Sequence, residues 1–221
     1  NITLDDGTVA GSRIGHQTGL VGSGNISVTS NGGSIALNAT HGVGTAIRTT
    51  GTVTLGAAAA GRTITESASS TIQAGAVNAT ANSGITLAGG NQIGSLSAAN
   101  TNSGGIQVTE AAGVKLTVTG MSQTGGNVVL TADDLDITGA INAGSNTVTL
   151  RPVTLSQAIN IESTPSGGLS LSPSDLSFVN AGVLEIGRND NSGTGTLTVN
   201  AIAGVLGDGD RKSTRLNSSH T

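Results

Sequence analysis

Three stretches of the chain share one pattern: NSGITL at residues 82–87, SGGIQV at residues 103–108 and GGNVVL at residues 125–130. In each stretch a cluster of Gly, Asn and Ser precedes a short segment with aliphatic residues at alternate positions. Such alternation is typical of a strand with one buried face, and Gly and Asn tolerate the positive φ angles of tight corners. The pattern therefore predicts short strands and corners that repeat with one period, of about 21 residues.

Aliphatic residues repeat along the chain in three series that share this spacing. The members of the first series are Ile64, Ile85, Ile106, Val128, Val148 and Leu169. The second series runs through Ile72, Ile93, Val114, Leu135, Leu155, Leu176 and Leu197. The third is looser, and its members are Val77, Ala98, Val118, Ile141, Ile161, Val183 and Val205.

Three short strands in each period of about 21 residues predict an all-β fold, a parallel β-helix or solenoid. Each period would form one coil, and equivalent residues would stack on successive coils. Before Ile64 the period is less clean, although Ile26 and Ile47, and likewise Ile35 and Leu55, keep nearly the same spacing. We therefore expect less regular coils over residues 1–60, with loops near residues 13–24 and 57–61, and regular coils over residues 61–209.

A series of antiparallel β-sandwich domains is the alternative fold, because it would also show short strands and turns. Such domains usually repeat at about 100 residues and have aromatic residues in the core. This chain has one Phe and neither Trp nor Tyr, which favours the solenoid.

The composition argues against several classes of protein. The chain has no Cys, so it can form no disulfide framework or thiolate metal site. It has a net charge of −4 and no Trp or Tyr to stack on bases, which argues against a nucleic-acid partner. No apolar run approaches the roughly 18 residues of a transmembrane helix, and the first residues do not show the basic segment and apolar run of a signal peptide.

The last residues differ in composition from the rest of the chain. Asp210 to His220 reads DRKSTRLNSSH and holds three of the nine basic residues. This segment resembles the codon-by-codon translation of a common short-read sequencing adapter. We interpret residues 210–221 as an artefactual tail without a functional role, and we expect the chain to be an internal piece of a longer protein.

Two segments resemble a known group of proteins. Residues 125–150 read GGNVVLTADDLDITGAINAGSNTVTL, and residues 151–187 contain RPVTLSQAINI and GGLSLSPSDLSFVNAGVLEIG. Both are similar to the β-strand repeats of filamentous-haemagglutinin-like exoproteins of Gram-negative bacteria. The resemblance implies a right-handed β-helical shaft, export by two-partner secretion or an autotransporter route with an outer-membrane secretion partner, and a role in adhesion, aggregation or biofilm formation. It also implies a secreted or cell-surface location and a host or bacterial surface receptor that the residues do not identify.

Few residues suggest chemistry. Asp133, Asp134 and Asp136 form an acidic cluster that could bind a cation or supply paired carboxylates, but no calcium-binding repeat accompanies it. In the predicted register Asp136 follows Leu135 as Lys115 follows Val114, so we expect a surface ion pair between Lys115 and Asp136.

The other candidate sites are weaker. His16 and His41 have no metal-binding spacing, and Gly207-Asp208-Gly209-Asp210 only partly matches a calcium loop. Asn38-Ala39-Thr40 and Asn78-Ala79-Thr80 match the glycosylation acceptor pattern, and whether Asn38 or Asn78 is modified stays open.

The functional prediction is a structural shaft segment of a large adhesin-like exoprotein. A self-associating aggregation module is the alternative structural role, and a β-helical polysaccharide-degrading enzyme is the rival from another class. Such enzymes need clustered acids and bases in a groove, whereas no charged residue occurs between Ser67 and Thr109. We therefore predict no enzyme activity and no catalytic, cofactor-binding or metal-binding residues.

Overall fold

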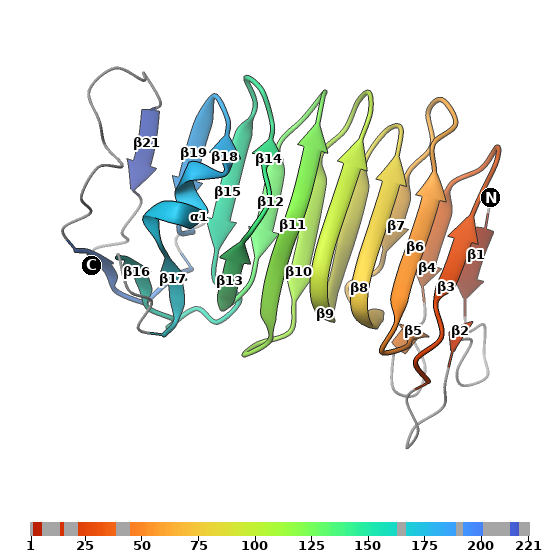
Figure 1. The fold of residues 1–221 in the computed structure, drawn as a ribbon, viewed down its shortest axis with the longest axis horizontal. Helices are drawn as coiled ribbons and strands as arrows, with labels where there is room; N and C mark the ends of the chain where they lie inside the picture. Colours follow the sequence, from red (N-terminus) through yellow and green to blue (C-terminus); the bar gives the residue numbers. More distant parts are fainter. Residues whose placement is uncertain are drawn as a thin grey trace.

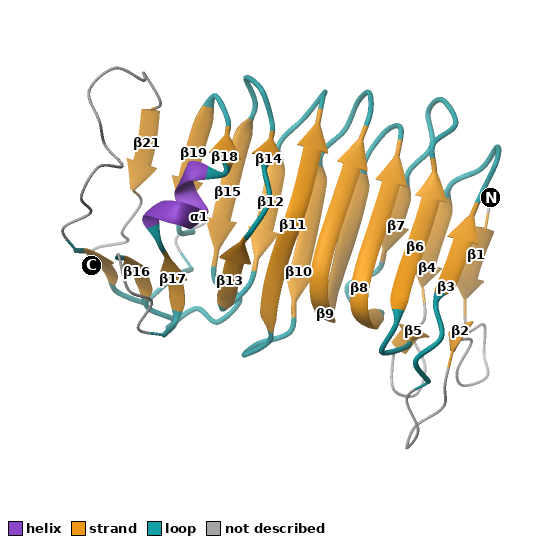
Figure 2. Ribbon diagram, viewed as in Figure 1, coloured by secondary structure: helices purple, strands orange, loops and turns teal. Residues whose placement is uncertain are grey.

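The computed structural model describes residues 2–5, 14–15, 22–38, 45–162, 167–188, 192–200 and 213–216. This part of the chain is all-β apart from one short helix, α1 (Pro173–Ser177). Strands stack side by side along one axis, as Figures 1 and 2 show. Every strand pairing in the described residues is parallel, so the antiparallel β-sandwich is excluded and the arrangement is compatible with a solenoid.

The strands form two long parallel ladders, and the chain alternates between them. The first ladder consists of β1 (Ile2–Asp5), β4 (Ile35–Asn38), β7 (Ile64–Glu66), the start of β9 (Ile85–Asn100), β10 (Ile106–Glu110), β12 (Val128–Thr131), β15 (Thr147–Arg151), β19 (Val183–Ile186) and β21 (Ser213–Leu216).

The second ladder faces the first. It consists of β2 (Ile14–Gly15), β3 (Ile26–Thr29), β5 (Thr45–Arg48), β6 (Thr52–Ala57), β8 (Thr71–Ala81), the end of β9, β11 (Lys115–Gln123), β13 (Asp134–Ile137), β14 (Ile141–Asn142) and β18 (Val179–Asn180). A separate small sheet holds β16 (Ile159–Ile161), β17 (Leu169–Leu171) and β20 (Leu197–Val199). β21 lies within the segment that we interpret as an artefactual tail.

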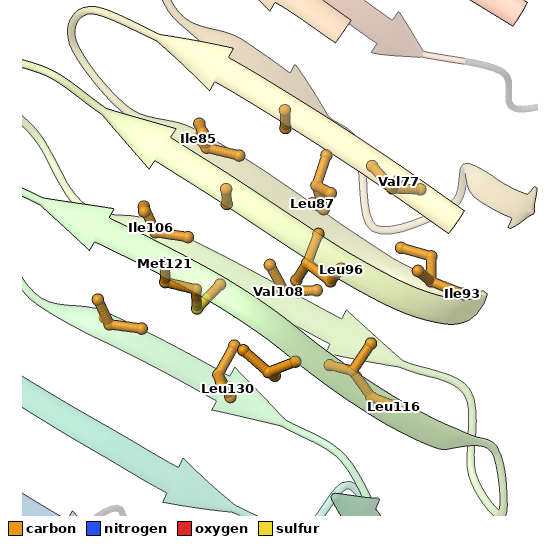
Figure 3. Packing of buried hydrophobic residues seen from close by; sticks show 14 of the residues in the cluster. Val77, Ile85, Leu87, Ile93, Leu96, Ile106, Val108, Leu116, Met121 and Leu130 are labelled. Carbon is orange, nitrogen blue, oxygen red and sulfur yellow. The ribbon is translucent and has the colours of Figure 1, made fainter. Parts of the chain in front are cut away.

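The core lies between the two ladders. Its buried aliphatic side chains come from alternate positions of strands in both ladders and form one continuous cluster. Figure 3 shows Ile85 and Ile106 of the first ladder together with Leu96 and Met121 of the second. Each of these four side chains is at most 3% exposed. Burial of such stacked side chains is worth roughly 1.5–3 kcal/mol for each residue and is the main source of stability.

The first aliphatic series is confirmed as far as Val148. Ile64 pairs with Ile85, which pairs with Ile106. Ile106 then pairs with Val128, and Val128 with Val148. The predicted series is therefore the sequence of stacked neighbours in the first ladder.

The register predicted for the second series is wrong by two residues. Ile93 pairs with Ala74 and not with Ile72, and Leu135 pairs with Leu116 and not with Val114. The third series shows the same shift at its first step, where Ala98 pairs with Ala79 and not with Val77. At its next step the shift is one of three residues, because Ala98 and Ile141 pair with Met121 and not with Val118. Side chains on a strand alternate with period two, so a shift of two residues keeps each aliphatic residue on the buried face. The hydrophobic pattern cannot distinguish the two registers.

The step predicted from Val148 to Leu169 is also wrong. Val148 pairs with Leu184, and Leu169 pairs with Ile159 in the small sheet. Residues 152–178 therefore form an insertion between β15 and β18 that contains β16, β17 and α1. Leu155, a member of the second series, is 46% exposed.

The coils at the start of the chain are longer than the regular ones. Ile35 pairs with Ile64, and Ile26 pairs with Val53. The near-regular spacings from Ile26 to Ile47 and from Ile35 to Leu55 therefore do not correspond to strand pairs. Loops of variable length take up the difference, and the aliphatic residues stay in register through strand pairing.

The number of strands in a coil also differs from the predicted three. β9 runs without interruption for 16 residues and contributes to both ladders, whereas the next coil has two strands, β10 and β11. β9 turns from one ladder to the other near Gly89, where a Cβ atom would overlap the carbonyl oxygen of Ser70. The absence of a side chain at Gly89 allows the backbones of neighbouring coils to approach this closely.

Candidate functional site

The outer face of the second ladder is lined by small polar side chains. One row of paired residues runs across successive strands and consists of Thr80, Ala99, Ser122, Asn142 and Asn180. Four of its five members carry a hydroxyl or an amide, and all but Ala99 are exposed. Asn78, one of the two glycosylation candidates, is exposed on the same face, two residues before Thr80 on β8.

Because successive side chains of a strand point to opposite faces, the three aspartates of the acidic cluster do not all lie on one face. Asp134 is exposed, and Asp136 makes the predicted ion pair, with 3.4 Å between Lys115 Nζ and Asp136 Oδ2. The pair is confirmed, although Lys115 lies opposite Asp134 in the register and reaches Asp136 diagonally. Both side chains are well exposed, so this pair contributes little to stability.

Asp133 points away from these two residues and holds the insertion to the ladders. Its Oδ1 accepts a hydrogen bond from the Thr154 N–H (2.8 Å), and its Oδ2 accepts from the Thr154 hydroxyl (2.6 Å) and the Gly113 N–H (3.2 Å). Burial raises the pKa of Asp133, but these hydrogen bonds outweigh it, and the pKa lies below its ordinary value. Asp133 is therefore a structural carboxylate.

Asp175 has a similar structural role at the other side of the insertion. Ser172 caps α1, Pro173 follows it, and the Asp175 carboxylate accepts from the Ser172 N–H and hydroxyl in a capping box. The other oxygen, Oδ1, accepts from the Ile137 N–H of β13 at 2.8 Å. Two buried carboxylates, Asp133 and Asp175, thus join the insertion to the regular strands.

A second group of acidic side chains, which the repeat pattern did not reveal, lies inside the molecule. Glu66, Asn91 and Glu110 are on three successive coils at one corner between the ladders, and they are 4%, 0% and 0% exposed. The Asn91 amide donates to Glu66 Oε2 at 2.9 Å, and Asn91 is the register partner of Glu110. We name these three residues the acid stack.

A sequence signal for the acid stack exists. Glu66 is two residues after Ile64, and Glu110 is four residues after Ile106, so strand alternation places both on the buried face.

A backbone N–H group donates to one oxygen of each glutamate in the acid stack. Glu66 Oε2 also accepts from the Gly89 N–H at 3.1 Å, and Glu110 Oε2 accepts from the Ile93 N–H at 3.1 Å. Oε1 of each carboxyl is buried and has no hydrogen-bond partner within the described residues.

Both glutamates of the acid stack bind protons more tightly than an exposed glutamate. Burial raises the pKa of Glu66 to about 7, against the hydrogen bonds from Asn91 and Gly89. Burial raises the pKa of Glu110 to about 8, and the nearby Glu66 raises it further against the hydrogen bond from Ile93.

The opposite corner of the coils is stabilised by neutral amides. Asn100, which is 0% exposed, accepts from the Gly84 N–H at 2.8 Å and donates to the carbonyl oxygens of Ser103 and Gly104. Gln123 on the next coil donates to the same Gly104 carbonyl. We name Asn100 and Gln123 the amide corner.

The remaining candidates can be placed only in part. His16, His41 and residues 207–210 lie outside the described residues, and so do Ala39 and Thr40 of the Asn38 acceptor pattern. In the described ranges no group of three or more His, Cys, Asp or Glu side chains could hold a metal ion. None of the helical structure in those ranges has the length and apolarity that a membrane-spanning helix requires.

Comparison with known proteins adds no assignment. The chain matches no protein-family model, no curated protein and no solved structure.

Proposed function

We propose that this chain is a structural shaft segment of a large secreted or cell-surface adhesin of the filamentous-haemagglutinin-like kind. The observation that carries the proposal is the register of the first ladder. Thr65, Thr86, Gln107, Val129, Thr149 and Glu185 are successive parallel neighbours over five steps. A stack in which each unit contacts only its neighbours can be extended without a change in cross-section, and a shaft requires this property.

The proposed architecture is a right-handed parallel β-helix with regular coils of about 21 residues. Two observations support it: the chain alternates between the two ladders, and the stacked neighbours from Ile64 to Val148 are evenly spaced in the sequence. Crossover connections between parallel strands of one sheet are right-handed in nearly all proteins.

The surface chemistry suits a shaft that works outside the cell. The row from Thr80 to Asn180 presents hydroxyls and amides, and the chain has no Cys that could form disulfides during export. Export through an outer-membrane partner, and display of a receptor-binding region elsewhere in a longer protein, belong to this proposal through the sequence resemblance.

Small-angle X-ray scattering with static light scattering on purified residues 1–209 tests the shaft role. A shaft segment gives an elongated particle whose mass stays that of a monomer as the concentration rises. A compact particle would contradict the proposal. An elongated particle whose mass grows with concentration would favour the alternative, a self-associating aggregation module that uses the polar rows.

An activity screen tests the enzymatic rival. We propose that the chain has no catalytic role, because the acid stack is enclosed in the core and Asp136 is paired with Lys115. Asp134 is the exposed carboxylate of the cluster. Turnover on a panel of polysaccharides that disappears in Asp134→Ala, but persists in Asp136→Ala, would contradict the structural role.

A further inference from the structure

The acid stack has no part in the proposed shaft role, although it places two carboxyls among the buried side chains of the molecule. We propose that the acid stack stabilises the corner between the two ladders only while its two carboxyl groups are protonated. In this proposal Glu66 and Glu110 are neutral acids in the folded chain, and removing their protons destabilises the coils from β7 to β10.

The hydrogen bonds of the acid stack fit neutral acids. Oε2 of each glutamate accepts from N–H groups, as the carbonyl oxygen of a neutral carboxyl does. Oε1 of each has no hydrogen-bond partner within the described residues, so a neutral acid leaves one O–H group unpaired there, whereas an ionised carboxylate would leave half of its charge without hydrogen bonds. An uncompensated buried charge is strongly unfavourable, and such a group ordinarily takes up a proton instead.

Asn91 separates the two acids and is itself fully hydrogen-bonded. The two hydrogens of its amide nitrogen are shared among Glu66 Oε2 and the carbonyl oxygens of Gly89 and Thr109, and its Oδ1 accepts from the Ile72 N–H at 2.7 Å. A neutral amide provides donors and an acceptor but cannot neutralise a carboxylate.

No cation among the described residues offsets the two acids. The strands packed around them, β4, β8, β9 and β12, contain no ionisable side chain, and β7 and β10 contain only Glu66 and Glu110. β11 contributes Lys115, which is exposed and paired with Asp136. The turn after β10 contacts Asp133, which is a further acid and not a counter-ion.

The direction of the pH effect follows from the raised pKa values. An ordinary glutamate has a pKa near 4.5, whereas those of Glu66 and Glu110 lie at about 7 and about 8. At pH values below 4.5 both are neutral in the folded and the unfolded chain, and the stability that the neutral acid stack provides is fully present. As the pH rises from 4.5 through 7 and 8, the unfolded chain releases protons that the folded chain retains, and stability is lost.

Urea unfolding of the full chain at pH values between 5 and 9 tests the proposal. While both acids stay neutral in the folded chain, each raises the unfolding constant about tenfold per pH unit. The double variant Glu66→Gln/Glu110→Gln imitates two neutral acids and should lose most of this pH dependence. Asp134→Asn removes an exposed carboxylate and is the matched control, so it should keep the wild-type dependence.

Carbon-13 NMR of the glutamate carboxyl groups is a second test that does not depend on the folding of a variant. Two carboxyl resonances of the wild-type chain should titrate above pH 6. Two results would overturn the proposal: all glutamate carboxyls titrating near pH 4.5, or an equally steep loss of stability in the double variant.

Discussion

The strands from β7 to β15 and the residues from 152 to 200 are both rich in short strands but differ in how those strands are ordered. In the first region each strand of the first ladder pairs with the next at an even spacing along the sequence, and its core side chains are almost fully buried. In the second region the chain leaves the ladders to form a small sheet and α1, returns to them at β18 and β19, and exposes about half of Leu155 and of Val199. The two regions therefore differ in whether equivalent residues stack on successive coils, although both form strands.

Core truncation should separate the two regions most strongly. Ile106 is 0% exposed and lies between Ile85 and Val128 in the first ladder. Ile106→Ala should reduce the free energy of unfolding by about 2–5 kcal/mol, because it removes buried methyl groups and leaves a cavity. Leu155→Ala, at a half-exposed site in the second region, should change it by no more than about 0.5 kcal/mol. Equal losses in urea unfolding would show that the regions do not differ in packing.

Glycine substitutions should show the same contrast on a smaller scale. In Gly89→Ala the new methyl group would overlap the Ser70 carbonyl oxygen, so the variant should lose about 1–3 kcal/mol. Gly193→Ala in the second region is the control, because its Cβ would meet only the Arg188 side chain at 3.6 Å or more. A destabilised Gly193→Ala beside an unaffected Gly89→Ala, in the same thermal or urea assay, would contradict the close approach of coils at this corner.

The contact between the two regions depends on Asp133. Asp133→Ala leaves the N–H groups of Thr154 and Gly113 and the Thr154 hydroxyl without their acceptor, and it should cost about 1–3 kcal/mol. Amide hydrogen exchange should quicken at Thr154 and Gly113 while Ile106 stays protected.

The stability of Asp133→Ala should also fall less in acid than the stability of the wild-type chain. Because the pKa of Asp133 is lowered in the folded chain, its contribution is present above the ordinary value of 3.8 and is lost as the pH falls through the folded value. A wild-type loss of stability below pH 4 that persists unchanged in Asp133→Ala would contradict this role.

The surface ion pair should give the smallest effect. A double-mutant cycle with Lys115→Ala and Asp136→Ala should give a coupling of about 0.2–1 kcal/mol that decreases as salt is added. A coupling of several kcal/mol, unchanged by salt, would mean that the pair is more buried than the structure has it.

The sequence predicted the regular region well and the rest less well, for physical reasons. The first series gave the correct partners for Ile85, Ile106 and Val128, because the corner clusters and the aliphatic residues share one period. In the second ladder Leu116 takes the place expected for Val114, since a shift of two residues preserves the buried face. Periodicity alone cannot detect such a shift.

Local signals could have corrected part of the remainder. Pro152 follows β15 directly, and Ser172, Pro173 and Asp175 have the spacing of a helix N-terminus with a capping box. These residues indicate that the repeat is interrupted before Leu169. The contacts of Asp133 with Thr154 and of Asp175 with Ile137 join residues that are distant in the sequence, and no pattern in the sequence specifies them.

Electron–electron distances between spin labels test the central claim that equivalent residues of successive coils lie one above the other. In each of three variants one label would replace the exposed Thr65, and the second label would replace Gln107, Glu185 or Ser170. At about 4.8 Å per step, the backbone separations should be about 10 Å for Gln107, two steps away, and about 24 Å for Glu185, five steps away. Ser170 would occupy the fifth step if the regular period continued without interruption. Separations that follow these steps, with Glu185 and not Ser170 at the fifth, support the account, and a Gln107 separation greater than that of Glu185 would contradict it.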